Sequence, residues 1–207
     1  MSKTQDFEQQ DKEYIANTYG RFNVCFEKGK GSLLWDVEGK EYIDLGSGIG
    51  VTAFGVDDDE WSKAVIAQTH ALNHISNLYY SVPQIKLAEL LCKRTGMKKV
   101  FFCNSGAESN ECAIKAARKY SHDKYGDGRN VIVTLVNSFH GRTVTTLSAT
   151  GQDVFHQHFF PFTEGFVHTP ANDIDAALKV LANPAVCAIM MEPIQNERPV
   201  LSQNPEL

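Results

Sequence analysis

Hydrophobic and polar residues alternate along the chain in blocks that predict a layered α/β protein. Three short apolar runs rich in β-branched or aromatic residues are typical of buried strands: Val100–Cys103, Val131–Val136 and Ala185–Met191. Helical patterns follow the first run and precede the third, at 107–118 and 173–181. Strands that alternate with helices form largely parallel sheets covered by helices, so we expect an α/β fold.

The first quarter of the chain has a different pattern. Residues 1–18 are polar and predict an arm or a short helix, and Gly31–Leu45 predicts a β-hairpin that turns through Asp36–Gly39. An acidic run then precedes a helical stretch at Trp61–Asn73, where negative charge favours a helix start. A second helix is expected at Pro83–Thr95. We place a domain boundary near Asp57, between a small β-rich segment (1–56) and a larger α/β domain (57–207).

The charge, the length of the apolar runs and the cysteine spacing exclude several classes of function. The 207 residues carry a formal charge of −5, which argues against a nucleic-acid-binding surface. No apolar run approaches the ~20 residues needed to cross a membrane, and the polar N-terminus lacks the core of a signal peptide. The five cysteines form no CxxC pair, so neither a metal site nor a disulfide framework is predicted. A cytoplasmic protein is expected.

The glycine-rich run Gly46–Gly50 invites comparison with a dinucleotide-binding loop. Val51 stands where the third glycine of that motif is required, and no βαβ unit surrounds the run. We expect instead that these glycines allow their backbone to approach a neighbouring surface closely.

The stretch Val100–Arg118 predicts a strand that turns through Ser105 and Gly106 into a helix. The first N–H groups of a helix have no partner within it, and the helix dipole favours negative charge there, so the turn is a candidate phosphate site. Ser105 also has a purely structural interpretation, as an N-cap that forms a capping box with Glu108.

Two further polar motifs follow strands of the same predicted sheet, at Asn137–Arg142 and Glu192–Gln195. The carboxyl ends of parallel strands meet at one edge of a sheet, so we expect all three motifs to lie together. Phe139 either stacks on a planar ligand or fills space against the core. Arg142 carries a two-donor fork that suits a carboxylate ligand or a structural ion pair. Glu192 needs a partner because a carboxylate is costly to bury alone.

Five motifs together resemble the class III (fold type I) pyridoxal-phosphate aminotransferases, in order and in spacing. They are Asn17–Arg21, Trp35–Asp44, Phe102–Glu111, Ser138–Thr143 and Glu192–Gln195. Within that family the sequence is most similar to the members that act on acetylornithine. The resemblance implies part of the family's large domain, with a mixed, mostly parallel sheet and flanking helices, behind a small β-rich N-terminal segment.

The resemblance also implies a set of cofactor-binding residues. Ser105, Gly106 and Ala107 would hold the phosphate of pyridoxal 5'-phosphate, Phe139 would stack on its pyridine ring, and His140 would lie beside Phe139. The site would need no metal.

For the substrates, the resemblance implies that Arg142 pairs with the α-carboxylate of the amino donor. Tyr19 would line the substrate channel, and Glu197 would pair with an arginine later in the chain. The implied reaction moves the δ-amino group of N-acetylornithine to 2-oxoglutarate, in arginine biosynthesis, within a homodimer that binds neither nucleic acid nor membrane.

The sequence departs from the family in two places. The family's lysine that binds the cofactor covalently, and its aspartate at the pyridine nitrogen, lie beyond residue 207, so no catalytic residue is assigned and the chain alone is expected to be inactive. Asn196–Pro199 replaces the glycines that usually follow Gln195. Alternative functions are an ornithine or succinylornithine aminotransferase, or a truncated, non-catalytic paralogue that acts by binding a partner.

Overall fold

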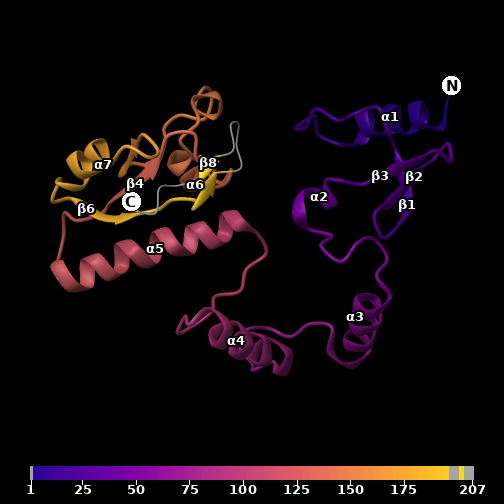
Figure 1. Cartoon of the computed structure of the whole chain (residues 1–207), viewed down its shortest axis with the longest axis horizontal. Coiled ribbons are helices and arrows are strands. Elements are labelled where there is room, and N and C mark those ends of the chain that lie inside the picture. The colour runs from indigo at the N-terminus through magenta and orange to yellow at the C-terminus, as the bar shows by residue number, and fades with distance from the viewer. Residues whose placement is uncertain (1, 196–200, 203–207) are drawn as a thin grey trace. The chain divides into compact units, whose positions relative to one another are not determined.

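The computed structural model describes residues 2–195 and the backbone of residues 201–202, and the chain forms two compact units (Figure 1). The N-terminal unit is Met1–Ile85 and the C-terminal unit is Lys86–Leu207. The division falls within a helix at Ile85, whereas the sequence placed a domain boundary near Asp57. Lys30 donates hydrogen bonds to the carboxylates of Asp57 and Asp59 and so joins the sheet to the following helix. The assignment of 57–207 to one domain stays a prediction.

The N-terminal unit begins with helix α1 (Lys3–Tyr14), followed by a three-stranded antiparallel sheet of β1 (Phe26–Lys30), β2 (Leu33–Asp36) and β3 (Glu41–Ile43). The predicted hairpin between β2 and β3 is confirmed. Buried Asp36 stabilises its turn, because its carboxylate accepts hydrogen bonds from the N–H groups of Glu38 and Lys40 and from the hydroxyl of Tyr42.

The glycine-rich run forms the short element α2 (Ser47–Gly50), in which Gly48 and Ile49 both have φ near +60°. A Cβ added at Gly50 would meet no described atom within 4 Å. The expected close backbone approach is therefore wrong for Gly50, where φ is +76° and glycine instead satisfies a left-handed backbone.

The two helices that complete this part of the chain are α3 (Asp59–Leu72) and α4 (Val82–Thr95). Both predictions are confirmed. Asp58 caps α3 by accepting the N–H of Trp61 at 2.8 Å, as expected for an acidic helix start. Leu87 and Leu90 of α4 remain 47% and 46% exposed, so its apolar face is only partly covered by the described residues.

The C-terminal unit contains a parallel sheet in the order β5-β4-β6, flanked by helices. Its elements are α5 (Gly106–Tyr125), β4 (Val131–Leu135), α6 (Val144–Ala149), the 3-10 turn η1 (Asp153–Phe155), β5 (Phe166–Thr169), α7 (Ile174–Leu181), β6 (Val186–Ile189), β7 (Ile194–Gln195) and β8 (Leu201–Ser202). Helix α5 covers one face of the sheet and α7 lies on the opposite side (Figure 1). Ile132, Val133 and Ile114 are almost fully buried and form the centre of the core. The expected α/β class and mostly parallel sheet are confirmed.

The strand predicted at Val100–Cys103 does not form. These four residues precede α5 without regular structure, and Phe101 is 62% exposed. An apolar, β-prone run becomes a strand only where a neighbouring strand accepts and donates its backbone hydrogen bonds. No such neighbour lies beside it among the described residues.

All five cysteines are free thiols; four of them are half-buried and Cys103 is exposed. Among the helices of the described residues, none combines the length and the apolar character needed to span a bilayer.

Candidate active site

The beginning of α5 packs directly against the loop that follows β4. A Cβ added at Gly141 would lie 2.8 Å from the Cβ of Ala107 and 3.1 Å from its Cα, so glycine alone permits this approach. Gly141 also has φ of +128°, a backbone conformation that other residues rarely adopt. Two of the three sequence motifs therefore meet, as predicted.

Ser105 caps α5, and its hydroxyl accepts the N–H of Glu108 at 3.2 Å. The reciprocal bond of the expected capping box is displaced by one residue, because the Glu108 carboxylate accepts the N–H of Asn104 at 2.6 Å. That hydrogen bond from Asn104 is also the main reason why the pKa of Glu108 is lowered. The capping box prediction is thus half correct.

The N–H groups of Gly106 and Ala107, at the start of α5, have no acceptor among the described residues. A Cβ added at Gly106 would meet nothing within 4 Å, so open space surrounds this backbone. Two adjacent unpaired N–H groups at the positive end of a 20-residue helix, with room in front of them, fit a phosphate group.

The loop after β4 is fixed to α5 by a second contact. The side-chain amide of Asn110 donates to the carbonyl oxygen of His140 at 2.7 Å. The N–H of His140 in turn donates to the hydroxyl of Thr150, a buried residue at the end of α6. Asn110 and Thr150 were not singled out from the sequence, because nothing in the local pattern shows which loop they reach across the fold.

The Glu192–Gln195 motif joins the same assembly from the end of β6. The Glu192 carboxylate accepts the N–H of Phe139 at 2.9 Å, which supplies the partner that the sequence required. The side-chain amide of Gln195, only 1% exposed, donates to the carbonyl oxygen of Val136. All three predicted motifs therefore lie together. Two of them follow the parallel strands β4 and β6, and the first joins them because the start of α5 packs against the loop after β4.

Phe139 is half-buried, and its ring lies 6.2 Å from that of Phe155 in an edge-to-face arrangement. The guanidinium carbon of Arg142 lies 5.8 Å from the centre of the Phe139 ring and 5.3 Å from that of Phe155. No carboxylate of the described residues forms an ion pair with Arg142. This arrangement leaves its hydrogen-bonding fork available to an anionic ligand.

His140 is 4% exposed and its Nε2 atom has no hydrogen-bond partner within the described part of the chain. Burial lowers the pKa of His140 to about 4, and the nearby His168 acts in the same direction. Burial likewise lowers the pKa of His168, which shares a 2.7 Å hydrogen bond with the hydroxyl of Thr134. Both imidazoles are thus held in the neutral form.

We expect the C-terminal unit to lose stability when the pH falls below the unfolded-state pKa of histidine. Between pH about 6.5 and 4 the unfolded chain binds a proton at residue 140 that the folded chain excludes, so the free energy of unfolding should fall by about 2 kcal/mol from pH 7.5 to 5 through His140. Hydrogen exchange of the β4 amides measures this loss of stability in the C-terminal unit. Tryptophan fluorescence would not, because both tryptophans, Trp35 and Trp61, lie in the N-terminal unit. In His140→Phe most of this pH dependence should disappear. An unchanged pH dependence would contradict the assignment.

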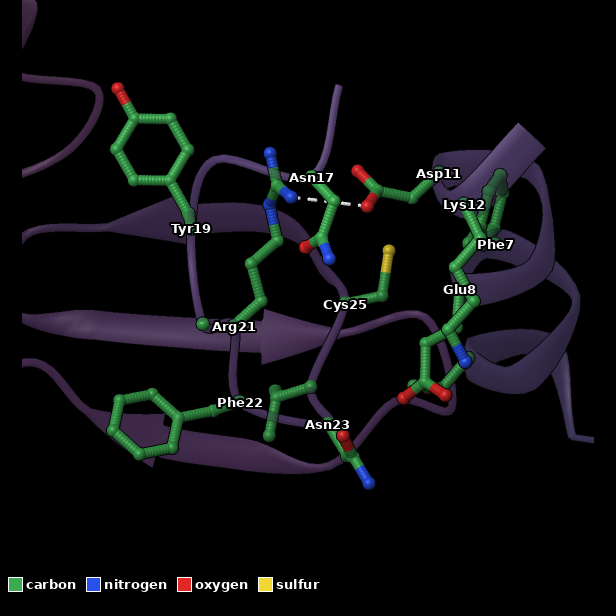
Figure 2. A pocket seen from close by; sticks show the side chains of 13 residues that line it. Phe7, Glu8, Asp11, Lys12, Asn17, Tyr19, Arg21, Phe22, Asn23 and Cys25 are labelled. Atoms are coloured by element: carbon green, nitrogen blue, oxygen red, sulfur yellow. Dashed lines mark hydrogen bonds and ion pairs between the residues drawn. The ribbon is translucent and has the colours of Figure 1, made fainter. Parts of the chain in front are cut away.

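Tyr19 lies in the N-terminal unit, where it lines a pocket of about 430 Å³ between α1 and residues 17–25 (Figure 2). Its side chain is 64% exposed, and the guanidinium of Arg21 lies 5.6 Å from the centre of its ring. Arg21 also forms a 3.0 Å ion pair with Asp11 of α1, and both residues line the pocket (Figure 2). The role of Tyr19 in a substrate channel stays a prediction. Glu197 lies outside the described residues.

Comparison with known proteins gives a consistent result. The family described as aminotransferase class-III matches residues 14–207. The acetylornithine aminotransferase of Haemophilus ducreyi is 55% identical over 194 residues, which cover 94% of this chain and 49% of that protein. The chain therefore spans about half the length of the curated relatives it matches.

Two solved structures are similar across almost the whole chain. The ornithine aminotransferase from Toxoplasma gondii, with pyridoxal phosphate at partial occupancy in its active site, has a TM-score of 0.90 at 28% identity and covers 97% of this chain and 48% of its own. The acetylornithine aminotransferase from Elizabethkingia anophelis has a TM-score of 0.80 at 27% identity and covers 99% of this chain and 48% of its own. These similarities confirm the predicted fold type I architecture.

Proposed function

Because the chain belongs to the class III aminotransferase family, we propose that its C-terminal unit holds pyridoxal phosphate, the cofactor of that family, and that the chain acts in transamination. One observation carries the proposal: the unpaired N–H groups of Gly106 and Ala107 lie next to the loop that follows β4. That loop contains Phe139, whose backbone N–H is held by the carboxylate of Glu192.

In this site each part of the chain has a separate task. The hydroxyl of Ser105 and the N–H groups of Gly106 and Ala107 would hold the phosphate, while Glu108 is occupied by Asn104 and leaves those groups free. Phe139 would lie against the cofactor ring, and the Glu192 bond to its backbone would orient it. When bound, pyridoxal phosphate supplies the electron-withdrawing ring that amino-group transfer requires.

The substrates we propose are N-acetylornithine as amino donor and 2-oxoglutarate as acceptor. The support is the name of the relative that is 55% identical and the unpaired fork of Arg142, which suits the α-carboxylate of a donor. Tyr19 and Glu197 complete the proposed substrate contacts. A role in arginine biosynthesis, a cytoplasmic location and a homodimer belong to the same proposal.

A second candidate function is ornithine transamination, because several structural relatives, including the Toxoplasma gondii enzyme, are ornithine aminotransferases. Succinylornithine remains a third donor. Turnover in a full-length version of the chain distinguishes all three from a non-catalytic role, whereas the 207-residue chain alone is expected to be inactive.

The cofactor assignment is tested by Gly106→Ala. The new methyl group meets no protein atom within 4 Å, and alanine is favoured over glycine in a helix, so the folded chain should be as stable as the wild type or slightly more so. The methyl would instead intrude on the phosphate, and we expect pyridoxal phosphate to bind about tenfold more weakly in an absorbance titration. Gly20→Ala is a matched control, since open space also surrounds Gly20. Equal affinities in the two variants would refute the phosphate site.

A further inference from the structure

Asn110 is a polar residue in the row of α5 side chains that packs against the rest of the C-terminal unit. Ala107, Asn110 and Ile114 are three and four positions apart, so they lie on one face of the helix, and Ile114 is only 2% exposed. A half-buried amide in a mostly apolar row needs a hydrogen-bond partner. That partner is the carbonyl oxygen of His140, 2.7 Å away in the loop that follows β4.

The backbone of Phe139 and His140 is held from three different parts of the chain. The carboxylate of Glu192, after β6, accepts the N–H of Phe139. The hydroxyl of Thr150, at the end of α6, accepts the N–H of His140. Neither of these bonds involves α5. Among the described residues, Asn110 alone joins these two residues to α5 by a hydrogen bond.

The same helix carries the proposed phosphate site at its first residues. Asn110 lies about one helical turn after Gly106, so helix geometry fixes the distance from its amide to the N–H groups of Gly106 and Ala107. The bond to His140 therefore sets where the neighbouring Phe139 lies relative to those N–H groups. Apolar packing between helix and loop permits a close approach, but only a hydrogen bond requires a particular direction.

Resting on the proposed function, we propose that Asn110 is a positioning residue for pyridoxal phosphate. It fixes the spacing between the phosphate-binding start of α5 and the ring of Phe139, so that one cofactor molecule reaches both. Two contacts on one ligand reinforce each other only when their spacing matches that ligand before it binds. Asn110 acts here through the backbone of His140 and does not itself touch the cofactor.

Asn110→Ala tests this role, because it removes the donor and leaves the carbonyl oxygen of His140 without its partner. In an absorbance titration of the 207-residue chain we expect pyridoxal phosphate to bind about tenfold more weakly, as the loss of a part-buried hydrogen bond predicts. Inorganic phosphate reaches only the start of α5. Its affinity, measured by its displacement of pyridoxal phosphate, should therefore be unchanged.

A spectroscopic signature gives a second readout that a general loss of stability would not produce. The cofactor ring is achiral, so its absorption band shows circular dichroism only when the ring is held in a fixed orientation by chiral surroundings. In Asn110→Ala this circular dichroism should fall for each molecule of cofactor that is bound.

Two further variants separate the hydrogen bond from other effects. Asn110→Leu keeps a side chain of similar size, adds no charge and lacks the donor, so it should lose the same affinity as Asn110→Ala. Glu111→Ala is the matched control. It removes another hydrogen bond between α5 and the loop, which the carboxylate of Glu111 accepts from the hydroxyl of Thr143. It should leave the affinity for pyridoxal phosphate nearly unchanged, and thermal unfolding verifies that all three variants are folded.

Three outcomes would overturn the role of Asn110 alone: an affinity for pyridoxal phosphate that Asn110→Ala leaves intact, an equal loss of affinity for inorganic phosphate, or wild-type affinity in Asn110→Leu. The second would mean that the start of α5 had moved, and the third that residue 110 acts by filling space. In each case Gly106→Ala still decides the phosphate site separately. If the unaltered chain binds no pyridoxal phosphate, the proposed function fails, and this role of Asn110 fails with it.

Discussion

Gly141→Ala is expected to lower the free energy of unfolding of the C-terminal unit by about 2–4 kcal/mol and to abolish tight binding of pyridoxal phosphate. Two costs add. Alanine is strained at φ of +128°, and its Cβ would lie 2.6 Å from the hydroxyl of Thr146 and 2.8 Å from the Cβ of Ala107. Relief of that overlap requires the β4–α6 loop to separate from α5, which moves Phe139 away from the phosphate-binding N–H groups.

Gly128→Ala separates strain from overlap. Gly128 has a similarly unfavourable φ of +90°, but a Cβ there meets nothing within 4 Å, so this variant should lose only about 1 kcal/mol and should bind the cofactor normally. Hydrogen exchange of the β4 amides and an absorbance titration give the two measurements. If Gly141→Ala lost no more stability and no more cofactor affinity than Gly128→Ala, the contact between Gly141 and Ala107 would not be needed for cofactor binding.

Arg142→Ala should weaken binding of N-acetyl-L-ornithine by about 1.5–3 kcal/mol, or roughly 10- to 150-fold, because a charge-assisted two-donor fork is lost. The free energy of unfolding should change much less. Arg142 has no ion-pair partner among the described residues, and its contacts with the rings of Phe139 and Phe155 contribute about 0.5–1 kcal/mol. A large loss of binding with a small loss of stability distinguishes a ligand contact from a structural ion pair.

Arg94→Ala provides the charge-matched control for that experiment. Arg94 lies exposed in the last turn of α4, and no hydrogen bond or ion pair from its side chain is found in the part of the chain that the structure describes. It should leave donor binding unchanged. A donor dissociation constant that Arg142→Ala did not alter would rule out Arg142 as the carboxylate contact.

The periodic part of the fold was predictable because its signals are local. Helices α3 and α7, and strands β4 and β6, agree with the predicted positions to within two residues or so. Strand β5 was missed, since its four residues include His168 and carry no alternation. The strand expected at Val100–Cys103 was wrong for the opposite reason: the local pattern was present, but the neighbouring strand was not.

The site was predictable at the level of motifs and not at the level of contacts. Parallel-strand topology brings Arg142 and Glu192 to one edge of the sheet, and Ser105 reaches that edge because α5 packs against the loop after β4. Which atom of Glu192 bonds to which backbone group depends on loop conformation, and so does the approach of Gly141 to Ala107. The shift of the Glu108 bond from Ser105 to Asn104 is also a matter of one residue, finer than a spacing rule resolves.

The contacts that assemble the site are widely separated along the chain. Those of Asn110 with His140, Phe139 with Glu192, and Val136 with Gln195 span 30, 53 and 59 positions. Closing such long loops costs conformational entropy before any of these bonds forms, so the site should be completed late in folding. A ligand that recognises only the finished site then stabilises the folded chain by mass action, by about 2.7 kcal/mol at a concentration 100 times its dissociation constant. The supply of cofactor would in this way set how much of the chain is folded, in addition to how much of it is loaded.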